Sequence, residues 1–270
     1  MKRIAFLGFA LILAACSPNE PDTATNTTVP LGSPVQFGVH EDLTAAGRSI
    51  RLDGATEQIY GCVNYRLLVR ELHLPRASRL EIDGVSVPSI CLTALGPAKA
   101  SIPLGDLPAG IHSLRIAARG TEVEGTLVTS PDSIVIVGGE GPWTKFPTRV
   151  LHRVPPGTIW GMIGWGPEDR SSEAQAFLTA LEASGAQPLV LAPGEYDYFS
   201  VAADGTVLAP PNRGYYFSRA FAYRMPGDRG AVPGLIVASD EHMWVSTFGD
   251  RGESWLSWVL RPSVATATIR

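Results

Sequence analysis

The sequence predicts a mainly β protein, with a β-sandwich domain followed by an α+β domain that has an antiparallel sheet and one or two helices. Three observations predict this class. Between about residues 37 and 139, apolar and polar residues alternate, with turn residues every eight to twelve positions. All six tryptophans follow Gly139, so the two halves build different cores. A helical spacing of apolar residues begins after residue 170.

The composition is that of a globular chain long enough for two domains. Its 270 residues are 45% hydrophobic and 18% charged, and domains of about 100–200 residues are usual. The formal net charge is −4, whereas a surface that binds nucleic acid is basic. We therefore expect no nucleic-acid partner.

The first fifteen residues form a predicted signal peptide. Lys2 and Arg3 precede a run, residues 4–13, that is apolar apart from Gly8, and two alanines follow. A run of that length is too short for a helix across a bilayer core of about 30 Å. Residues 1–15 are therefore expected to direct export and to be removed.

The stretch Leu13-Ala14-Ala15-Cys16 resembles the lipobox of bacterial lipoproteins. The resemblance implies that Cys16 becomes the first mature residue and carries acyl chains, which hold a protein on a membrane without a spanning helix. In that family a residue other than Asp at the next position, here Ser17, is typical of export to the outer membrane. We expect a membrane-anchored cell-envelope protein, with the outer membrane favoured and the folded domains extracytoplasmic.

Residues 16–36 are expected to form the lipidated cysteine and a flexible tether, because they are rich in Ser, Thr, Asn and Pro. With Cys16 acylated, Cys62 and Cys91 remain as an even pair in an oxidising compartment, where a disulfide is the expected state. Two buried free thiols, or a metal or redox pair, are the alternatives.

Residues 37–139 are expected to form the sandwich. Period-two patterns predict its strands, with hairpin turns at Asp83-Gly84 and Arg119-Gly120. The predicted strands are Val63–Val69, Leu80–Ile82, Val85–Val87, Ala98–Leu104, Leu114–Ala118, Val123–Leu127 and Ile134–Val137.

The segment Leu107–Ile116, which reads Leu-Pro-Ala-Gly-Ile-His-Ser-Leu-Arg-Ile, resembles the penultimate hairpin of bacterial immunoglobulin-like and fibronectin-III-like modules. His112 stands where a Tyr is commoner in those modules. The resemblance implies an immunoglobulin-like sandwich in which His112 fills a corner position. It identifies no ligand.

Residues 140–270 are expected to form the aromatic-rich α+β domain, after the glycine-rich break at 138–142. A helix is predicted over Glu173–Ser184, opened by a capping box of Ser172 and Gln175. The other predicted elements are strands at Ile159–Trp165, Leu189–Leu191, Glu195–Val201, Thr206–Leu208, Gly214–Tyr223, Leu235–Ala238 and Met243–Phe248, and a closing helix near Glu253–Leu260. The strand at 159–165 has apolar residues on both sides and should be covered on both faces.

Five aromatic residues of this domain are candidates for ligand binding by ring stacking: Trp165, Tyr196, Tyr198, Tyr216 and Trp244. Tyr196 and Tyr198 fall on one face of a predicted strand. Trp165 lies at a strand end before a loop, where we expect its ring to be partly exposed. The alternative is that these rings fill the core, and their exposure separates the two interpretations.

The sequence holds no nucleophile elbow, no zinc-protease helix motif and no phosphate-binding glycine loop. Asp240-Glu241-His242 is the densest titratable cluster, and a carboxylate beside an imidazole can orient a base. A polar turn between two strands explains the same tripeptide. We expect no catalytic residue, no bound metal and no cofactor.

The chain is therefore expected to act as a non-catalytic binding or scaffold module that contacts another envelope protein or polymer through an exposed apolar patch. Two other hypotheses are open. An envelope hydrolase with an unfamiliar site predicts a deep pocket with converging carboxylates or His242. An inhibitor or immunity-type lipoprotein predicts a loop that inserts into the cleft of a partner enzyme.

Overall fold

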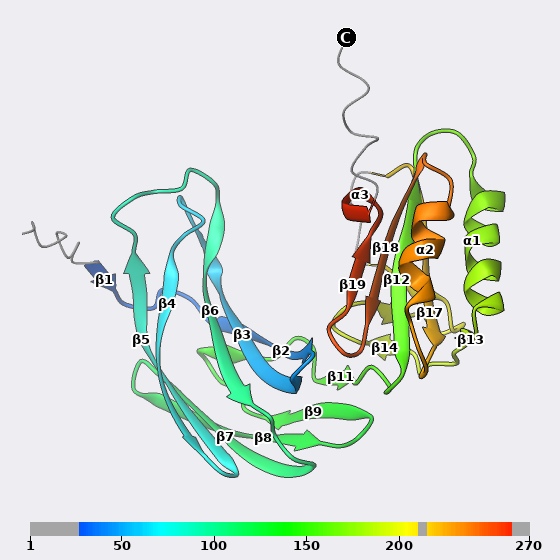
Figure 1. Ribbon diagram of the computed structural model, residues 1–270. Coiled ribbons are helices and arrows are strands. Elements are labelled where there is room, and N and C mark those ends of the chain that lie inside the picture. The colour runs from blue at the N-terminus through cyan, green and yellow to red at the C-terminus, as the bar shows by residue number, and fades with distance from the viewer. Residues whose placement is uncertain (1–26, 210–214, 261–270) are drawn as a thin grey trace, which may run out of the picture.

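The computed structural model describes residues 27–209 and 215–260, which fold into two bodies (Figure 1). Strands β1–β11 build the first body, and strands β12–β19 with helices α1–α3 build the second. The mainly β class predicted from the sequence is confirmed.

The first body is one mixed sheet of eleven strands in the order β10-β2-β3-β6-β4-β5-β7-β8-β9-β11, with β1 paired to β5 outside this path. The pairs β5–β7, β4–β6 and β10–β2 are parallel, and the other pairs are antiparallel. The strands are β1 (Thr27–Val29), β2 (Val35–Thr44), β3 (Gly47–Tyr60), β4 (Arg66–Leu74), β5 (Ala77–Val87), β6 (Gly96–Gly105), β7 (Gly110–Ala118), β8 (Thr121–Thr129), β9 (Ser133–Gly138), β10 (Thr144–Lys145) and β11 (Val150–His152).

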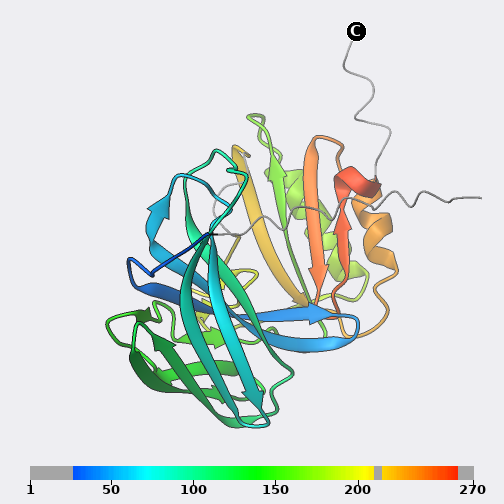
Figure 2. The same cartoon turned by 90° about the vertical axis from the view of Figure 1, so that its left-hand side faces the viewer.

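This sheet curls around an apolar core (Figures 1 and 2). Every second residue of β2 from Val35 to Leu43 is buried, because successive side chains of a strand point to opposite faces. The same alternation in β3, β6 and β7 brings Leu52, Ile102 and Leu114 into the core. The strand order is that of a curled mixed sheet, and the immunoglobulin-like order expected for this region is not confirmed.

Gly84 lies inside β5, so the hairpin turn predicted at Asp83-Gly84 is wrong. Its φ of +147° lies in the region that favours glycine. A Cβ at this position would stand 2.5 Å from the carbonyl oxygen of Val29, because β1 runs alongside β5. Gly84, which had indicated a turn, instead allows β1 to approach the backbone of β5 closely. The turn predicted at Arg119-Gly120 is confirmed, since both residues have positive φ between β7 and β8.

The sheet extends beyond residues 37–139 at both ends. Before residue 37, β1 pairs with β5 and Leu31 is buried in the core, within the stretch expected to be tether. After residue 139, β10 pairs with β2, β11 pairs with β9, and the Phe146 ring stacks on Phe37 with their centroids 5.7 Å apart. The first body therefore continues to His152.

The second body has a five-stranded antiparallel sheet in the order β13-β17-β12-β18-β19 and a small sheet of β14, β15 and β16. Its elements are β12 (Thr158–Trp165), α1 (Ser171–Ala183), β13 (Gln187–Pro188), β14 (Gly194–Glu195), β15 (Ser200–Val201), β16 (Val207–Leu208), β17 (Phe217–Arg224), α2 (Ala231–Ala238), β18 (Met243–Gly249), β19 (Ser254–Leu256) and α3 (Ser257–Leu260). An antiparallel sheet with few helices is what the sequence predicted.

Strand β12 is covered on both faces, as expected. Ile163 packs against the helices through Phe177 of α1 and Val232 of α2. Trp160 points the other way, into an aromatic cluster that contains Phe199. The strand is therefore the centre of the second body.

Other local predictions in this body are wrong. The helix predicted over Glu173–Ser184 is confirmed as α1, but the predicted capping box is wrong, because Ser172 donates to Glu173 instead of pairing with Gln175. Residues 231–238 form α2, where Leu235–Ala238 was predicted as a strand, since a short apolar run does not distinguish a strand from a buried helix turn. The closing segment starts as β19 and becomes helical at Ser257.

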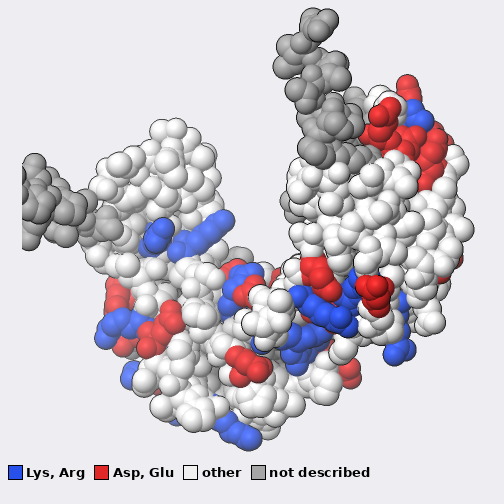
Figure 3. Space-filling view, viewed as in Figure 1, with Lys and Arg blue, Asp and Glu red and all other residues white. Residues whose placement is uncertain are grey.

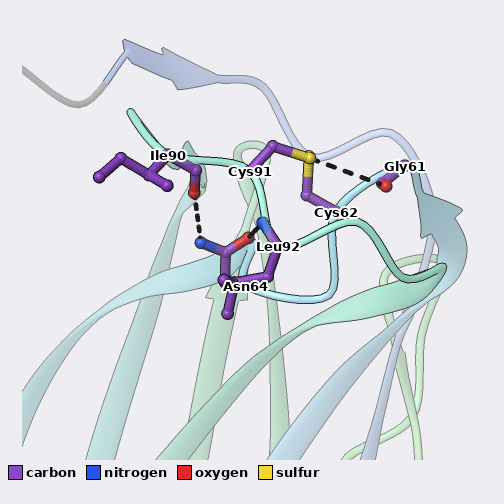
Figure 4. The surroundings of a disulfide bond; sticks show 6 residues. All are labelled: Gly61, Cys62, Asn64, Ile90, Cys91 and Leu92. Atoms are coloured by element: carbon purple, nitrogen blue, oxygen red, sulfur yellow. Dashed lines mark hydrogen bonds between the residues drawn. A yellow bond between two sulfur atoms is a disulfide. The ribbon is translucent and has the colours of Figure 1, made fainter.

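The predicted disulfide between Cys62 and Cys91 is confirmed, with the two Cα atoms 5.3 Å apart (Figure 4). It joins the loop after β3 to the loop after β5. Asn64 ties the same loops: its amide nitrogen donates to the carbonyl of Ile90 at 2.7 Å, and its amide oxygen accepts from the backbone N–H of Leu92 at 3.1 Å. The two loops therefore form one cross-braced unit.

Within the two ranges that the structure covers, the helices are all too short or too polar to cross a membrane. Cys16, the predicted lipidation site, lies outside the described residues, as does Gly214 at the start of a predicted strand.

Candidate functional site

The structure separates the five predicted ring-stacking residues. Tyr216 is 76% exposed and Trp244 is 42% exposed. Tyr196 and Trp165 are buried, and the expectation that Trp165 is partly exposed is wrong, because its ring packs in the core between the sheet and the helices. Tyr198 is half-buried and lies between the two bodies.

Trp244 lies on the face of the five-stranded sheet opposite the helices. It alternates along β18 with Met243 and Val245, which are buried on the helix side. The Tyr215 ring packs against the Trp244 ring with centroids 5.2 Å apart. Gly164 of β12 pairs with Trp244, and a Cβ on this glycine would stand 2.5 Å from the Tyr215 ring. The glycine therefore makes room for the tyrosine on the sheet.

We call Tyr215, Tyr216 and Trp244 the aromatic rim. The sequence pattern indicated Tyr216 and Trp244, but Tyr215 and Gly164 were missed. Their contact depends on the register between β12 and β18 and on the course of the chain before β17. No pattern of nearby residues reports such a contact.

The two bodies meet at one end and diverge at the other, so the molecule is hollowed between them (Figure 3). On the first body a groove of about 780 Å³ lies where β4 and β6 separate, and these strands pair at Arg66 and Lys99. Both cations are exposed, and neither forms an ion pair with another described residue. Tyr65 and Ser101 line the same groove.

The hairpin of β2 and β3 joins the bodies. Leu43 of this hairpin is buried in a cluster with Val154, Trp160 and Tyr196, which follow the first body in the sequence. The turn between β18 and β19 lies against the same hairpin, since a Cβ on Gly252 would stand 2.8 Å from the Cα of Thr44. Apolar burial therefore fixes one body on the other.

Tyr198 belongs to this junction. Its hydroxyl donates to the carbonyl of Glu41 at 2.7 Å and accepts from the backbone N–H of Leu43 at 3.1 Å. The strand predicted at Glu195–Val201 is wrong, because the chain turns at Asp197, which has a φ of +67°. The turn breaks the alternation that placed Tyr196 and Tyr198 on one face.

His40 lies between two carboxylates at the same junction. Its Nδ1 is 2.5 Å from Oδ1 of Asp197, and its Nε2 is 3.5 Å from Oδ2 of Asp53. The hydrogen bond to Asp197 raises the pKa of His40 against the opposing effect of burial. His40 and Asp197 are 157 residues apart in the chain, so the sequence carried no signal that they interact.

We expect this pair to stabilise the fold at low pH. Because the pKa of His40 is raised in the folded state, its contribution is fully present below the unfolded value of 6.5 and is lost as the pH rises through the folded pKa. Burial also raises the pKa of Tyr198, so that phenol stays neutral in this range. The free energy of unfolding, measured in urea, should be lower at pH 9 than at pH 6. Asp197→Asn should flatten this difference, and an unchanged slope in that variant would contradict the assignment.

Glu41 is a buried carboxylate between two arginines. Its side chain is 3% exposed, although it stands at a core-facing position of β2. Arg153 Nε donates to Glu41 Oε1 at 2.7 Å, and Arg48 Nη1 donates to Oε2 at 3.2 Å. The sequence did carry a signal here, since a Glu on the apolar side of an alternating strand needs a buried partner.

A second buried ion pair continues from the first. Arg229 is 4% exposed and donates to Asp250 at 2.6 Å and to Glu253 at 2.8 Å. Arg48 Nη2 approaches Asp250 at 3.9 Å. These charged groups are bonded to one another, so we assign them the role of fixing the orientation of the two bodies.

The tripeptide Asp240-Glu241-His242 forms a polar turn between α2 and β18, as one interpretation of the sequence had it. Asp240 accepts from the backbone N–H of His242 at 2.7 Å, which lowers the pKa of this carboxyl, and it pairs with Arg170 at 3.5 Å. His242 itself is exposed. Asp240 therefore stabilises the turn through this hydrogen bond.

No protein-family model, no curated protein and no solved structure matches this chain.

Proposed function

We propose that this chain is a lipid-anchored cell-envelope protein that acts as a binding module, and that the aromatic rim is its contact surface. The Tyr215–Trp244 pair, on the sheet face opposite the helices, carries the proposal. Flat, half-exposed rings bind the apolar faces of sugars, arginine side chains and other rings. A partner protein or an envelope polymer offers such groups.

The junction between the bodies supports this role because it holds the rim in one place. The Arg48–Asp250 ion pair and the burial of Leu43 connect the second body, whose sheet carries the rim, to the first body. An immunoglobulin-like origin of the first body belongs to the same proposal. His112 supports it, since the side chain is buried and its Nε2 donates to the carbonyl of Pro108 at 2.7 Å, as expected of a corner residue.

The lipid anchor is tested by labelling cells with a fatty-acid probe. In cells grown with a fatty-acid probe, we expect the wild-type chain to be labelled and to sediment with membranes, because Cys16 stands in a lipobox. Cys16→Ser should remove the label. A wild-type chain that stays unlabelled would contradict the anchor.

The rim is tested by cross-linking in intact cells. A photoreactive phenylalanine analogue in place of Tyr216 should form a defined adduct, because this position is exposed and follows Tyr215, whose ring packs against Trp244. Trp244→Ala should weaken binding by about 2 kcal/mol, roughly 30-fold in affinity, as loss of a central aromatic contact does. The adduct yield should fall accordingly.

Trp258→Ala is the matched control, because that tryptophan is 54% exposed on α3. It should leave the adduct yield unchanged. Equal yields in both tryptophan variants, or the same adducts from a reporter at Ile111 on the first body, would show that the rim is not the contact surface.

A further inference from the structure

We propose that the disulfide-braced end of the first body inserts into the surface of the lipid bilayer. We call this end the disulfide tip and define it as residues 59–64 and 88–95. Cys62–Cys91 and the two hydrogen bonds of Asn64 hold its two loops together. The inference of which way the tip faces rests on the proposed anchor at Cys16.

The tip presents large aliphatic side chains to solvent. Ile90 is 75% exposed and Leu95 is 79% exposed, and Leu92 and Ile59 are more than half exposed. Residues 89–95 are exposed without interruption. Figure 4 shows the Ile90 side chain directed away from the disulfide. Exposed aliphatic residues on rigid loops are suited to enter the boundary between headgroups and acyl chains.

The same stretch carries no charge. Residues 58–65 and 84–98 contain no Asp, Glu, Lys or Arg. The corresponding end of the first body is free of charged side chains in the space-filling view, and Lys or Arg groups lie beneath it (Figure 3). A charged group at this end would oppose transfer out of water, so the composition favours an apolar environment.

The chain enters the fold beside this tip. Thr27 of β1 pairs with Val87, the last residue of β5 before the tip loop. Ten residues separate Cys16 from Thr27. A chain of that length spans at most about 40 Å when fully extended and has an r.m.s. reach of roughly 20 Å. The acylated residue is therefore tied close to the tip, which directs the tip toward the membrane.

Two basic residues, Arg66 and Lys99, lie close to the tip, where they could contact anionic headgroups. Arg66 and Lys99 are register partners across β4 and β6; Arg66 is two positions along the chain from Asn64, and Lys99 is four positions from Leu95. At about 3.3 Å per strand residue both lie within roughly 13 Å of the tip. Long basic side chains reach toward headgroups from such a depth while their stems stay on apolar surface. The ligand is thus a bilayer with anionic headgroups.

The test separates the tip from the anchor. The processed chain, residues 16–270, is prepared with Cys16→Ser, so it bears no acyl chain, and is sedimented with vesicles of phosphatidylethanolamine and phosphatidylglycerol. We expect measurable binding. The triple variant Ile90→Ser, Leu92→Ser, Leu95→Ser should lower the partition coefficient about ten-fold, because three aliphatic side chains leave the interface.

The matched control is Leu72→Ser, Leu74→Ser, Ile111→Ser, since these side chains are 55%, 56% and 65% exposed outside the tip. It should bind vesicles as the parent chain does. Arg66→Gln with Lys99→Gln should weaken binding to the anionic vesicles and leave binding to phosphatidylcholine vesicles unchanged. Thermal unfolding of each variant confirms that these surface changes preserve the fold.

Equal binding by the tip and control variants would overturn the proposal, as would a parent chain that stays in the supernatant. A concentration-dependent dimer that the tip variant abolishes would assign the tip to a second copy of the chain instead. Because Cys16 is already replaced, these outcomes are independent of whether the wild-type chain is acylated. Fatty-acid labelling that fails while vesicle binding persists would remove only the anchor.

Discussion

Glu41→Gln is expected to lower the free energy of unfolding by about 3–5 kcal/mol, the usual cost of removing one member of a buried ion pair. The variant keeps the shape of the side chain but leaves Arg48 and Arg153 without the carboxylate that they share. These guanidiniums are 21% and 15% exposed, so water compensates them only in part. Urea unfolding followed by tryptophan fluorescence measures the loss.

The matched control is Glu81→Gln. Glu81 also pairs with an arginine, since Arg70 Nη2 lies 2.9 Å from its Oε1, but the carboxylate is 42% exposed. Exposed pairs contribute at most about 1 kcal/mol. A Glu41 variant that loses no more stability than this control would show that the buried carboxylate contributes no more than an exposed one.

Replacing the whole group should cost less than breaking it. With Glu41→Leu, Arg48→Met and Arg153→Met together, no buried charge is left unpaired, so stability should recover relative to Glu41→Gln. Recovery will be partial, because Arg48 also donates to the carbonyl of Val154 and Arg153 to that of Ser130. Comparing the triple variant with Glu41→Gln separates the cost of leaving two arginines unpaired from the net contribution of the ion pairs to stability.

The strands were predictable where one face of the sheet is buried. In β6, β7 and β18 alternate residues are buried, and this period-two pattern located the strands from the sequence alone. Cys62 and Cys91 were paired by counting. Pattern also located helix α1, because its buried residues recur at i, i+3, i+4 and i+7.

Predictions failed where distant segments decide the structure. Gly84 was assigned to a turn because its neighbours permit one, but β1 explains this glycine from more than fifty residues away. His40 and Asp197 meet across 157 residues. Trp165 was expected at the surface because it ends a strand, but the apolar core between sheet and helices covers its ring. Local sequence reports alternation and turns, whereas these contacts depend on topology.

Removing the disulfide by Cys62→Ala with Cys91→Ala is expected to cost about 3–4 kcal/mol of unfolding free energy. The cysteines are 29 residues apart, and closing a loop of this length restricts the unfolded chain by about that amount in the chain-entropy account. The same loss should follow when the wild-type protein is unfolded in a thiol reductant, which makes the reductant a control without any substitution.

The region that loses stability shows whether the disulfide stabilises the tip alone or the whole sheet. Asn64 still bridges the two loops through Ile90 and Leu92 in the variant, so the strands should stay paired while residues 89–95 open more often. Amide hydrogen exchange should therefore rise at the tip and remain slow in β7 and β8, which lie elsewhere in the sheet. Asn64→Ala in the disulfide-bonded chain should cost only about 1 kcal/mol, the value of lost hydrogen bonds at a partly exposed site. If the double cysteine variant loses no more than that, Asn64 holds the loops, and the disulfide is dispensable for the tip.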